Sequence, residues 1–479
     1  MLRSMARPPY VDFPVRLGGR RASAGDIVSA VIAEVRAGRL PAGARLPPVR
    51  VLEGRLGLSK NTASAAYDEL CARGVLVSRE REGVFVAGPE EGVERTSAIA
   101  APPLPLLRPA PAIGAPSLPR GVISLSTVFI DPELLPRERL AECARSVLRT
   151  PGLAHGYDGQ GLPILRELIA KRLCARGIEC EPEHVIVTTG SQQALDLIAR
   201  ATEVRRVAVE TPVYSYARML FASLGLGVTG LRLDPFEGPD LARWERELAR
   251  TRPGFLYAIT SFQNPTGYSY STHELERLLE LSRKYDFALV EDDWGSDMLS
   301  GGEHRPMLRM LGGPNVLYVN SFTKKLLPSL RIGFLVAHPS LVPTLLAHKR
   351  MSTLGNAWLT EAVVAEFLDR GYYDTHLASL QRELDARYAA CLDSLADTMP
   401  EGVRWTRPGG GPTLWLEVPR DVDLEALRAR CEARGVRVES TEAHFEGEPH
   451  LFGFRISYAW SPPEVLRKGL AILAEEIAR

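Results

Sequence analysis

Beyond about residue 121, short apolar runs alternate with helix-like segments, and this alternation constrains the fold more than any other feature. The strand-like runs are HVIVTT, RVAVE, FLYAIT, ALVEDD and VLYVNSF, and segments such as QALDLIARA, YARMLFASL and HELERLLELSRKY lie between them. A helix between two strands lets the second strand run parallel to the first in one sheet. The pattern therefore predicts an α/β domain with a mostly parallel sheet.

The chain has 479 residues, which favours two or three domains. Residues 89–120 are rich in Pro and Ala and have almost no strand or helix pattern, which is typical of an extended, semi-rigid linker. We therefore expect one domain over residues 1–88, a linker over 89–120 and the α/β domain over 121–479.

Charge is unevenly distributed, although the formal net charge is zero. Residues 1–88 contain 14 Lys and Arg against 8 Asp and Glu, a net charge of +6, and the remainder of the chain carries −6. A basic head on an acidic body favours contact between the N-terminal domain and nucleic acid.

Composition is that of a soluble globular protein, with 45% hydrophobic and 24% charged residues. The first residues lack the apolar stretch of a secretory signal, and no apolar run is long enough to cross a membrane. The six cysteines are scattered without a CxxC pair, so we expect reduced thiols and no metal site. These features predict a cytoplasmic protein without a membrane partner.

The N-terminal domain carries a helix-turn-helix pattern. Residues 25–37 have apolar side chains at helical spacing, VRVLEGRLG is a short helix ending at Gly57, and LSKNTASAAYDELCARG begins with an N-cap at Ser59 and ends at Gly74. Two helices joined around a glycine are typical of this motif. The following VLVSREREGVFVA predicts the β-hairpin of a winged helix.

The stretch LPPVRVLEGRLGLSKNTASAAYDELCARGVLVSREREGVFVA resembles the winged-helix domain of the GntR superfamily. The resemblance implies a double-stranded DNA operator as partner, with Ser59 capping the second helix or binding phosphate. It implies DNA contacts from Arg50, Lys60, Asn61 and Thr62. Pro48 and Val49 replace two small polar residues of the family, and the wing tip is Arg81-Glu82-Gly83. The alternative is a winged helix used only for protein contacts.

The segment NSFTKKLLPSLRIGF, residues 320–334, fits a lysine that forms a Schiff base with a phosphorylated cofactor. Such a lysine needs a pocket that lowers its pKa and nearby groups that bind phosphate. Ser321 and Thr323 offer hydroxyls beside Lys324, and Arg331 can neutralise the phosphate. Lys325 is the competing candidate, because only the register separates the two lysines.

Five further residues lie at strand ends or at a helix start. Ser191 and Gln192 begin a helix after VIVTTG, where free N–H groups favour a phosphate, although an ordinary βα turn gives the same pattern. Asp292 ends the strand FALVED, at the edge where open α/β sheets bind ligands. Tyr214 follows another strand end, and Asn264 lies in an Asn-Pro-Thr-Gly turn that could equally be a surface turn.

Together these segments resemble the aspartate-aminotransferase-like fold of type I pyridoxal 5'-phosphate (PLP) proteins, over about residues 121–479 with a small C-terminal α+β subdomain from roughly residue 365. The resemblance implies that Lys324 forms the internal aldimine, that Asp292 pairs with the pyridine nitrogen and that Asn264 bonds the phenolic oxygen. It implies that Tyr214 stacks on the ring, and that the phosphate is bound by Ser191, Gln192, Ser321, Thr323 and Arg331.

Two more residues follow from this resemblance. Arg455, in FRISYA, matches the arginine that receives a substrate α-carboxylate, and the alternative is a buried ion-pair residue. Tyr157 matches a tyrosine lent to the phosphate of the partner subunit, which implies a homodimer. One position departs from the pattern of this family, because Trp294 stands where the family commonly has a tyrosine that bonds the phenolic oxygen of PLP. An indole N–H cannot exchange a proton as a phenol does, which counts against fast transamination.

The order of head, linker and aminotransferase-like body resembles the MocR-type regulators over nearly the whole chain. The resemblance implies that an amine or amino-acid effector exchanges with Lys324 at the aldimine and changes the placement of the DNA-binding heads. The leading hypothesis is a PLP-dependent transcription regulator. One alternative is an active aminotransferase carrying a DNA-binding head. Asn264 favours this alternative, because many regulators of this type have a bulky aromatic residue at that position. Another alternative is a regulator of vitamin B6 supply with PLP itself as effector.

Overall fold

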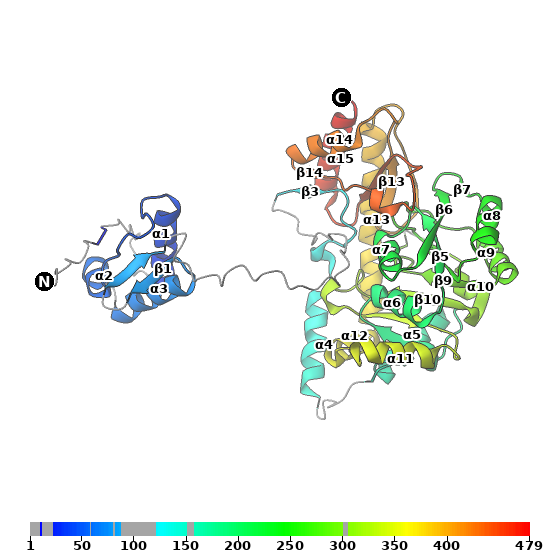
Figure 1. Ribbon diagram of the computed structural model, residues 1–479, viewed down its shortest axis with the longest axis horizontal. Coiled ribbons are helices and arrows are strands. Elements are labelled where there is room, and N and C mark those ends of the chain that lie inside the picture. Colours follow the sequence, from blue (N-terminus) through cyan, green and yellow to red (C-terminus); the bar gives the residue numbers. More distant parts are fainter. Residues whose placement is uncertain are drawn as a thin grey trace. The chain divides into compact units, whose positions relative to one another are not determined.

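A computed structural model of the chain describes residues 10–11, 23–57, 59–79, 82–87, 121–150, 158–299 and 305–479. The chain divides into two compact units, Met1–Pro111 and Ala112–Arg479, which Figure 1 traces by colour. The predicted linker 89–120 lies outside the described residues.

The described part of the first unit contains three helices followed by a hairpin. The helices are α1 (Ala24–Arg36), α2 (Val49–Leu56) and α3 (Lys60–Ala72), and the antiparallel strands are β1 (Leu76–Arg79) and β2 (Gly83–Val86). A capping box between Ser23 and Asp26 starts α1, and Gly57 ends α2 in the left-handed conformation at φ 59°. The predicted N-cap at Ser59 is confirmed, because its side chain accepts a hydrogen bond from the Thr62 N–H.

Backbone hydrogen bonds join residues 44–46, which precede α2, to strand β2 of the hairpin. The N–H of Leu46 donates to the Val84 carbonyl at 2.8 Å, and the N–H of Val86 donates to the Ala44 carbonyl at 2.9 Å. The Tyr67 hydroxyl of α3 donates to the Pro47 carbonyl at 2.7 Å, which fixes α3 against the segment that leads into α2. The predicted winged helix is thereby confirmed.

An eight-stranded sheet forms the centre of the second unit, in the order β4-β11-β10-β9-β8-β5-β6-β7. Neighbours from β10 to β6 are parallel, whereas β11 is antiparallel to both β10 and β4, and β7 is antiparallel to β6. The prediction of a mostly parallel sheet is confirmed. The strands are β4 (Val185–Thr188), β5 (Arg206–Thr211), β6 (Gly227–Asp234), β7 (Gly238–Pro239), β8 (Phe255–Ala258), β9 (Ala288–Asp292), β10 (Val316–Ser321) and β11 (Gly333–Val336).

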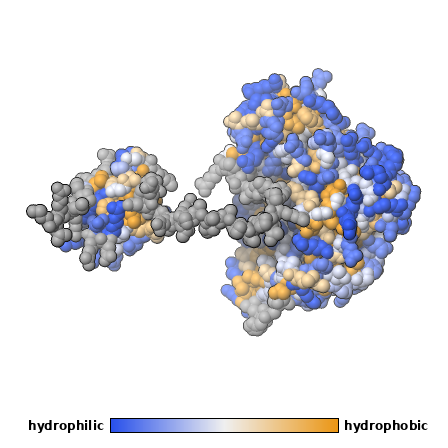
Figure 2. Space-filling model, viewed as in Figure 1, coloured by the Kyte–Doolittle hydropathy of each residue, from blue (hydrophilic) through white to orange (hydrophobic). Residues whose placement is uncertain are grey.

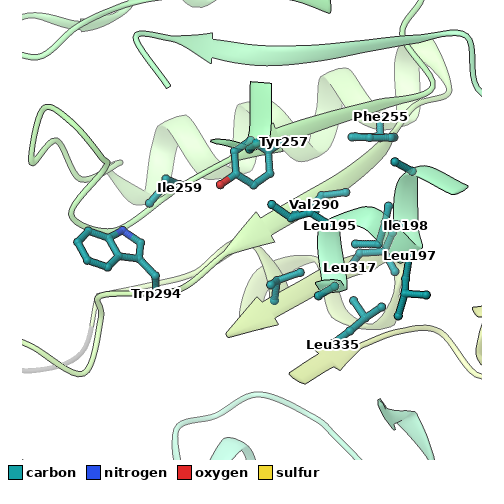
Figure 3. Packing of buried hydrophobic residues seen from close by; sticks show 14 of the residues in the cluster. Leu195, Leu197, Ile198, Phe255, Tyr257, Ile259, Val290, Trp294, Leu317 and Leu335 are labelled. Atoms are coloured by element: carbon teal, nitrogen blue, oxygen red, sulfur yellow. The ribbon is translucent and has the colours of Figure 1, made fainter. Parts of the chain in front are cut away.

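Helices cover both faces of this sheet, since successive strand residues point to opposite sides. On one face, α6 (Ser191–Ala201) and α7 (Ser215–Ser223) pack on the strands, and Figure 3 shows Leu195 and Ile198 beside Val290 and Leu317. The opposite face is covered by two groups of helices. They are α4 (Arg137–Arg149), α5 (Pro163–Ala175) and α12 (Trp358–Asp369), and α8 (Leu241–Thr251), α9 (Thr272–Tyr285) and α10 (Leu308–Gly312).

The C-terminal part of the second unit forms a smaller α+β layer. Its antiparallel sheet has the order β12-β13-β15, and the two-residue strand β14 pairs in parallel with β3 from the start of the unit. The strands are β3 (Ile123–Ser124), β12 (Arg404–Trp405), β13 (Thr413–Glu417), β14 (Val436–Arg437) and β15 (Gly453–Ser457). The helices of this layer are α13 (Tyr372–Thr398), α14 (Leu424–Ala433) and α15 (Pro463–Ile477). The helix α11 (Val342–Thr353) precedes the layer and packs against α6.

Hydrophilic side chains cover much of the visible face of the second unit, notably over α8 and α9 (Figure 2). Within the described ranges, none of the helices combines the length and the apolar character needed to cross a bilayer.

Candidate functional site

Lys324 lies in the loop that follows β10, at the carboxyl end of the parallel strands. Its Nζ is 3.7 Å from the centre of the Phe129 ring. Burial, together with the positive charges of Arg455 and Arg331, lowers the pKa of Lys324 to about 7. A substantial fraction of this amine is therefore neutral near pH 7, and a neutral amine is the form that attacks a carbonyl carbon.

The neighbouring Lys325 has a different environment. Its side chain is 1% exposed, and its Nζ donates to Asp297 Oδ2 at 3.0 Å and to Asn320 Oδ1 at 2.9 Å. Asp297 also pairs with Arg176 at 3.1 Å. Lys325 is thus held in a buried ion-pair network, whereas the amine of Lys324 faces an aromatic ring and two cations.

A candidate anion-binding corner lies at the start of α6. Gly190 precedes the helix at φ 89°, no side chain caps it, and Ser191 and Gln192 form its first turn. Arg331 Nη2 donates to the Thr189 carbonyl at 2.9 Å. A Cβ on Gly190 would lie only 2.8 Å from Arg331 Nη2, so glycine permits this close approach. A helix N-terminus beside a guanidinium group favours a phosphate.

The two predicted hydroxyls lie beside this loop on β10 and just after it. Ser321 Oγ donates to Thr323 Oγ1 at 2.8 Å, and the Thr323 N–H donates to Ser321 Oγ at 3.0 Å. Both side chains are buried, so the loop that carries Lys324 has a fixed local geometry.

Asp292 ends β9 inside the unit. Its Oδ2 accepts a hydrogen bond from the Tyr257 hydroxyl at 2.8 Å, and burial raises the pKa of Asp292 to about 7. A cationic partner would stabilise this carboxylate in its ionised form. Tyr257 carries no sequence signal of this role, because it lies within an ordinary apolar strand.

Arg455 on β15 joins the small layer to the site. Its Nη1 donates to Asn264 Oδ1 at 2.9 Å, and its Nη2 donates to the Ser126 carbonyl at 2.9 Å and to Glu439 Oε2 at 3.2 Å. The structure thus brings the predicted pair Asn264 and Arg455 together. Ser126 and Glu439 were not among the predicted residues, and no motif marks either of them.

Two aromatic side chains lie near Asp292. Tyr214 precedes α7, and burial followed by the charge of Asp292 raises its pKa. Trp294 lies in the apolar cluster between the sheet and its helices, and Figure 3 shows its indole beside Ile259. Tyr157 lies outside the described residues.

Several buried polar atoms of these residues have no hydrogen-bond partner among the described residues. They are Gln192 Oε1, Asp292 Oδ1, Trp294 Nε1 and Arg455 Nε. Buried polar groups are normally paired, so unpaired atoms in one region indicate a polar ligand. Asp292 Oδ1 can accept a hydrogen bond from a protonated pyridine nitrogen, and Trp294 Nε1 can donate one to a phenolic oxygen, so a group that carries both fits these two atoms.

The candidate DNA-binding residues gather on the first unit. Ser59, Lys60 and Asn61 are exposed at the start of α3, Thr62 is half-buried there, and Arg50 is exposed in the first turn of α2. Long donors at the N-terminus of a recognition helix suit phosphates and base edges.

Comparison with known proteins shows the family of both units. Residues 126–473 match the family described as aminotransferase class I and II, and residues 24–86 match bacterial regulatory proteins of the gntR family. Among curated proteins, a 2-aminoadipate transaminase of Thermus thermophilus is 34% identical over 74% of this chain and 90% of its own length. The probable rhizopine catabolism regulatory protein MocR of Rhizobium meliloti is 31% identical over 91% of this chain and 90% of its own length.

Solved structures agree with this assignment for the second unit. LysN, an α-aminoadipate aminotransferase of Thermus thermophilus solved with a phosphopyridoxyl-leucine, is 34% identical with a TM-score of 0.69. The similarity covers 75% of this chain and 92% of LysN. PLP is accordingly the cofactor of the second unit, and the unpaired atoms of Asp292 and Trp294 fit it. With a gntR-family winged helix before a class I and II aminotransferase domain, the chain belongs to the MocR-type regulators.

Proposed function

We propose that this regulator senses an amine or amino-acid effector at Lys324 and transmits its binding to the DNA-binding head. The observation that carries the proposal is the environment of Lys324, whose pKa is lowered to about 7 within a chain that also contains a gntR-family winged helix. A lysine with this pKa is partly neutral near pH 7, and only the neutral amine can attack a carbonyl carbon.

Bound PLP supplies an aldehyde carbon that one primary amine can take from another. In the proposal, Lys324 would be the amine that holds the cofactor, and an effector amine would compete with it for this carbon. Asp292 pairs with the pyridine nitrogen, Asn264 bonds the phenolic oxygen, and Tyr214 stacks on the ring. The phosphate is bound by Ser191, Gln192, Ser321, Thr323 and Arg331.

The head is proposed to bind a double-stranded operator through α3. Lys60, Asn61 and Thr62 at its N-terminus, with Arg50 from α2, make the contacts, while Ser59 caps the helix. A homodimer is also proposed, with Tyr157 contributed to the partner's phosphate site. An effector can switch such a dimer only if it binds two conformations with different affinity, and ~1–3 kcal/mol of coupling is a common magnitude.

A second candidate function is catalytic transamination. The hydrogen bond between Asn264 and Arg455 favours it, because Asn264 is an enzyme-like feature and Arg455 can hold a substrate carboxylate. Trp294 weighs against it, since its indole N–H cannot exchange a proton. The regulator therefore remains the leading proposal.

A half-reaction distinguishes the two functions. The PLP-loaded protein is mixed with a panel of amino donors, and formation of pyridoxamine phosphate is followed by absorbance, with turnover measured after addition of a keto acid. Spectral binding without turnover supports a sensor. Rapid turnover with a keto acid would overturn the regulator-only proposal.

A further inference from the structure

Arg455 is already engaged with protein oxygens on the edge where a ligand carboxylate would bind. Asn264 and Ser126 offer neutral oxygens at 2.9 Å, and Glu439 offers a carboxylate oxygen at 3.2 Å. Arg455 is 10% exposed, so its positive charge is largely removed from water. Of these three partners, Glu439 is the one that neutralises this charge.

Glu439 combines a fixed backbone with a side chain at the solvent boundary. It lies two residues after β14, where its N–H donates to Ser126 Oγ at 2.9 Å. Its side chain is 51% exposed, and Arg455 is its ion-pair partner. A half-exposed carboxylate can leave the ion pair and become hydrated at low cost, whereas a fully buried one cannot.

We infer that Glu439 is a specificity-determining residue that competes with effector carboxylates for Arg455. The inference rests on the proposed sensing site. The pair of Arg455 and Glu439 has no net charge, so a carboxylate that approaches it must either displace Glu439 or lie beside a like charge. A primary amine without a carboxylate on its amine-bearing carbon avoids both costs. The resting site therefore favours amines of that class over α-amino acids.

A pair of ligands that differ only by the carboxylate tests this inference. L-2-aminobutyrate and propylamine are titrated into PLP-loaded wild type, Glu439→Gln and Glu442→Gln, and dissociation constants are taken from the absorbance of bound PLP. Glu442 is an exposed residue three positions away, and its substitution changes the net charge by the same amount. It therefore controls for a general charge effect.

Glu439→Gln should bind L-2-aminobutyrate about tenfold more tightly than wild type, the effect of one competing contact to a charged group. Propylamine should bind both proteins alike, and Glu442→Gln should behave as wild type. An unchanged or weaker affinity for L-2-aminobutyrate in Glu439→Gln overturns the inference. An equal gain in Glu439→Gln and Glu442→Gln also overturns it.

A second measurement does not depend on sensing. Butyrate, which has a carboxylate and no amine, is titrated by calorimetry into the same three proteins after removal of PLP. Tighter butyrate binding in Glu439→Gln alone supports the competition at Arg455, and its absence overturns it. If butyrate shows this gain but neither amine changes the spectrum of the loaded protein, the competition stands and the proposed sensing function fails.

Discussion

Lys324→Met and Lys325→Met should have opposite effects on thermal stability and on PLP attachment, although the two residues are adjacent. Lys325 is buried and donates to Asp297 at 3.0 Å and to Asn320 at 2.9 Å. Burial alone would raise the pKa of Asp297, but Lys325 and Arg176 outweigh it and hold this pKa below its usual range. Removing Lys325 therefore leaves the buried, ionised carboxylate of Asp297 with only one of its two cationic ion-pair partners among the described residues.

The loss of stability in Lys325→Met follows from the partners that Asp297 keeps. Breaking a buried pair costs about 3–5 kcal/mol, and the lower end applies here because Asp297 keeps Arg176 at 3.1 Å and the Tyr373 hydroxyl at 3.1 Å. At about 2 °C per kcal/mol for a large domain, Lys325→Met should lower Tm by roughly 6 °C. Lys324→Met removes a desolvated amine that has no ion-pair partner among the described residues, so Tm should stay the same or rise.

The assay combines thermal melts of the PLP-free proteins with covalent labelling. Each protein is incubated with PLP, reduced with borohydride and analysed by peptide mass spectrometry. Lys325→Met should be labelled at Lys324, and Lys324→Met should not be labelled in the loop. Labelling of Lys325 in the wild type, or a Lys325→Met protein with unchanged Tm and no label, would refute the assignment of the two lysines.

Three further outcomes are expected. The rate at which PLP attaches to the PLP-free protein should rise between pH 6 and pH 8 with a midpoint near pH 7. The reason is that the pKa of Lys324 is lowered to about 7 and the neutral amine is the reactive form. A midpoint near the ordinary lysine pKa of 10.5 would contradict this prediction. Asp292→Asn should weaken PLP binding by about tenfold to a hundredfold through loss of one charged contact, without lowering the Tm of the PLP-free protein, as equilibrium titration and melts can measure. Lys60→Ala and Arg50→Ala should each reduce the slope of log affinity against log salt by about one in an operator-binding assay, whereas Arg73→Ala at the other end of α3 should not.

Local periodicity and helix caps made much of the fold predictable from sequence. The N-cap at Ser59 and the left-handed Gly57 are set by residues within one turn, so the helix-turn-helix limits could be placed. The runs that became β8, β9 and β10 begin with consecutive apolar residues because helices cover both faces of the sheet. The pairing of β3 with β14 had no such signal, since these two-residue strands lie more than 300 positions apart in the chain.

The site was less predictable wherever it depends on partners distant in sequence. The pattern around Lys324 could not exclude Lys325, and the partner that separates them, Asp297, is 28 positions away. Ser126 meets Arg455 across 329 positions, and Tyr257 meets Asp292 across 35. Glu439 lies 16 positions before Arg455 and reaches it only because β14 and β15 belong to the same small layer.

The central claim is that an amine bound at Lys324 alters DNA binding. Its most direct test is the affinity of the full-length, PLP-loaded protein for its upstream DNA, measured by fluorescence anisotropy at fixed salt with and without a saturating amine. Wild type should change its affinity by at least about fivefold, and Lys324→Met should not respond. An affinity that is the same with and without the amine in wild type, or an equal response in Lys324→Met, would contradict the account.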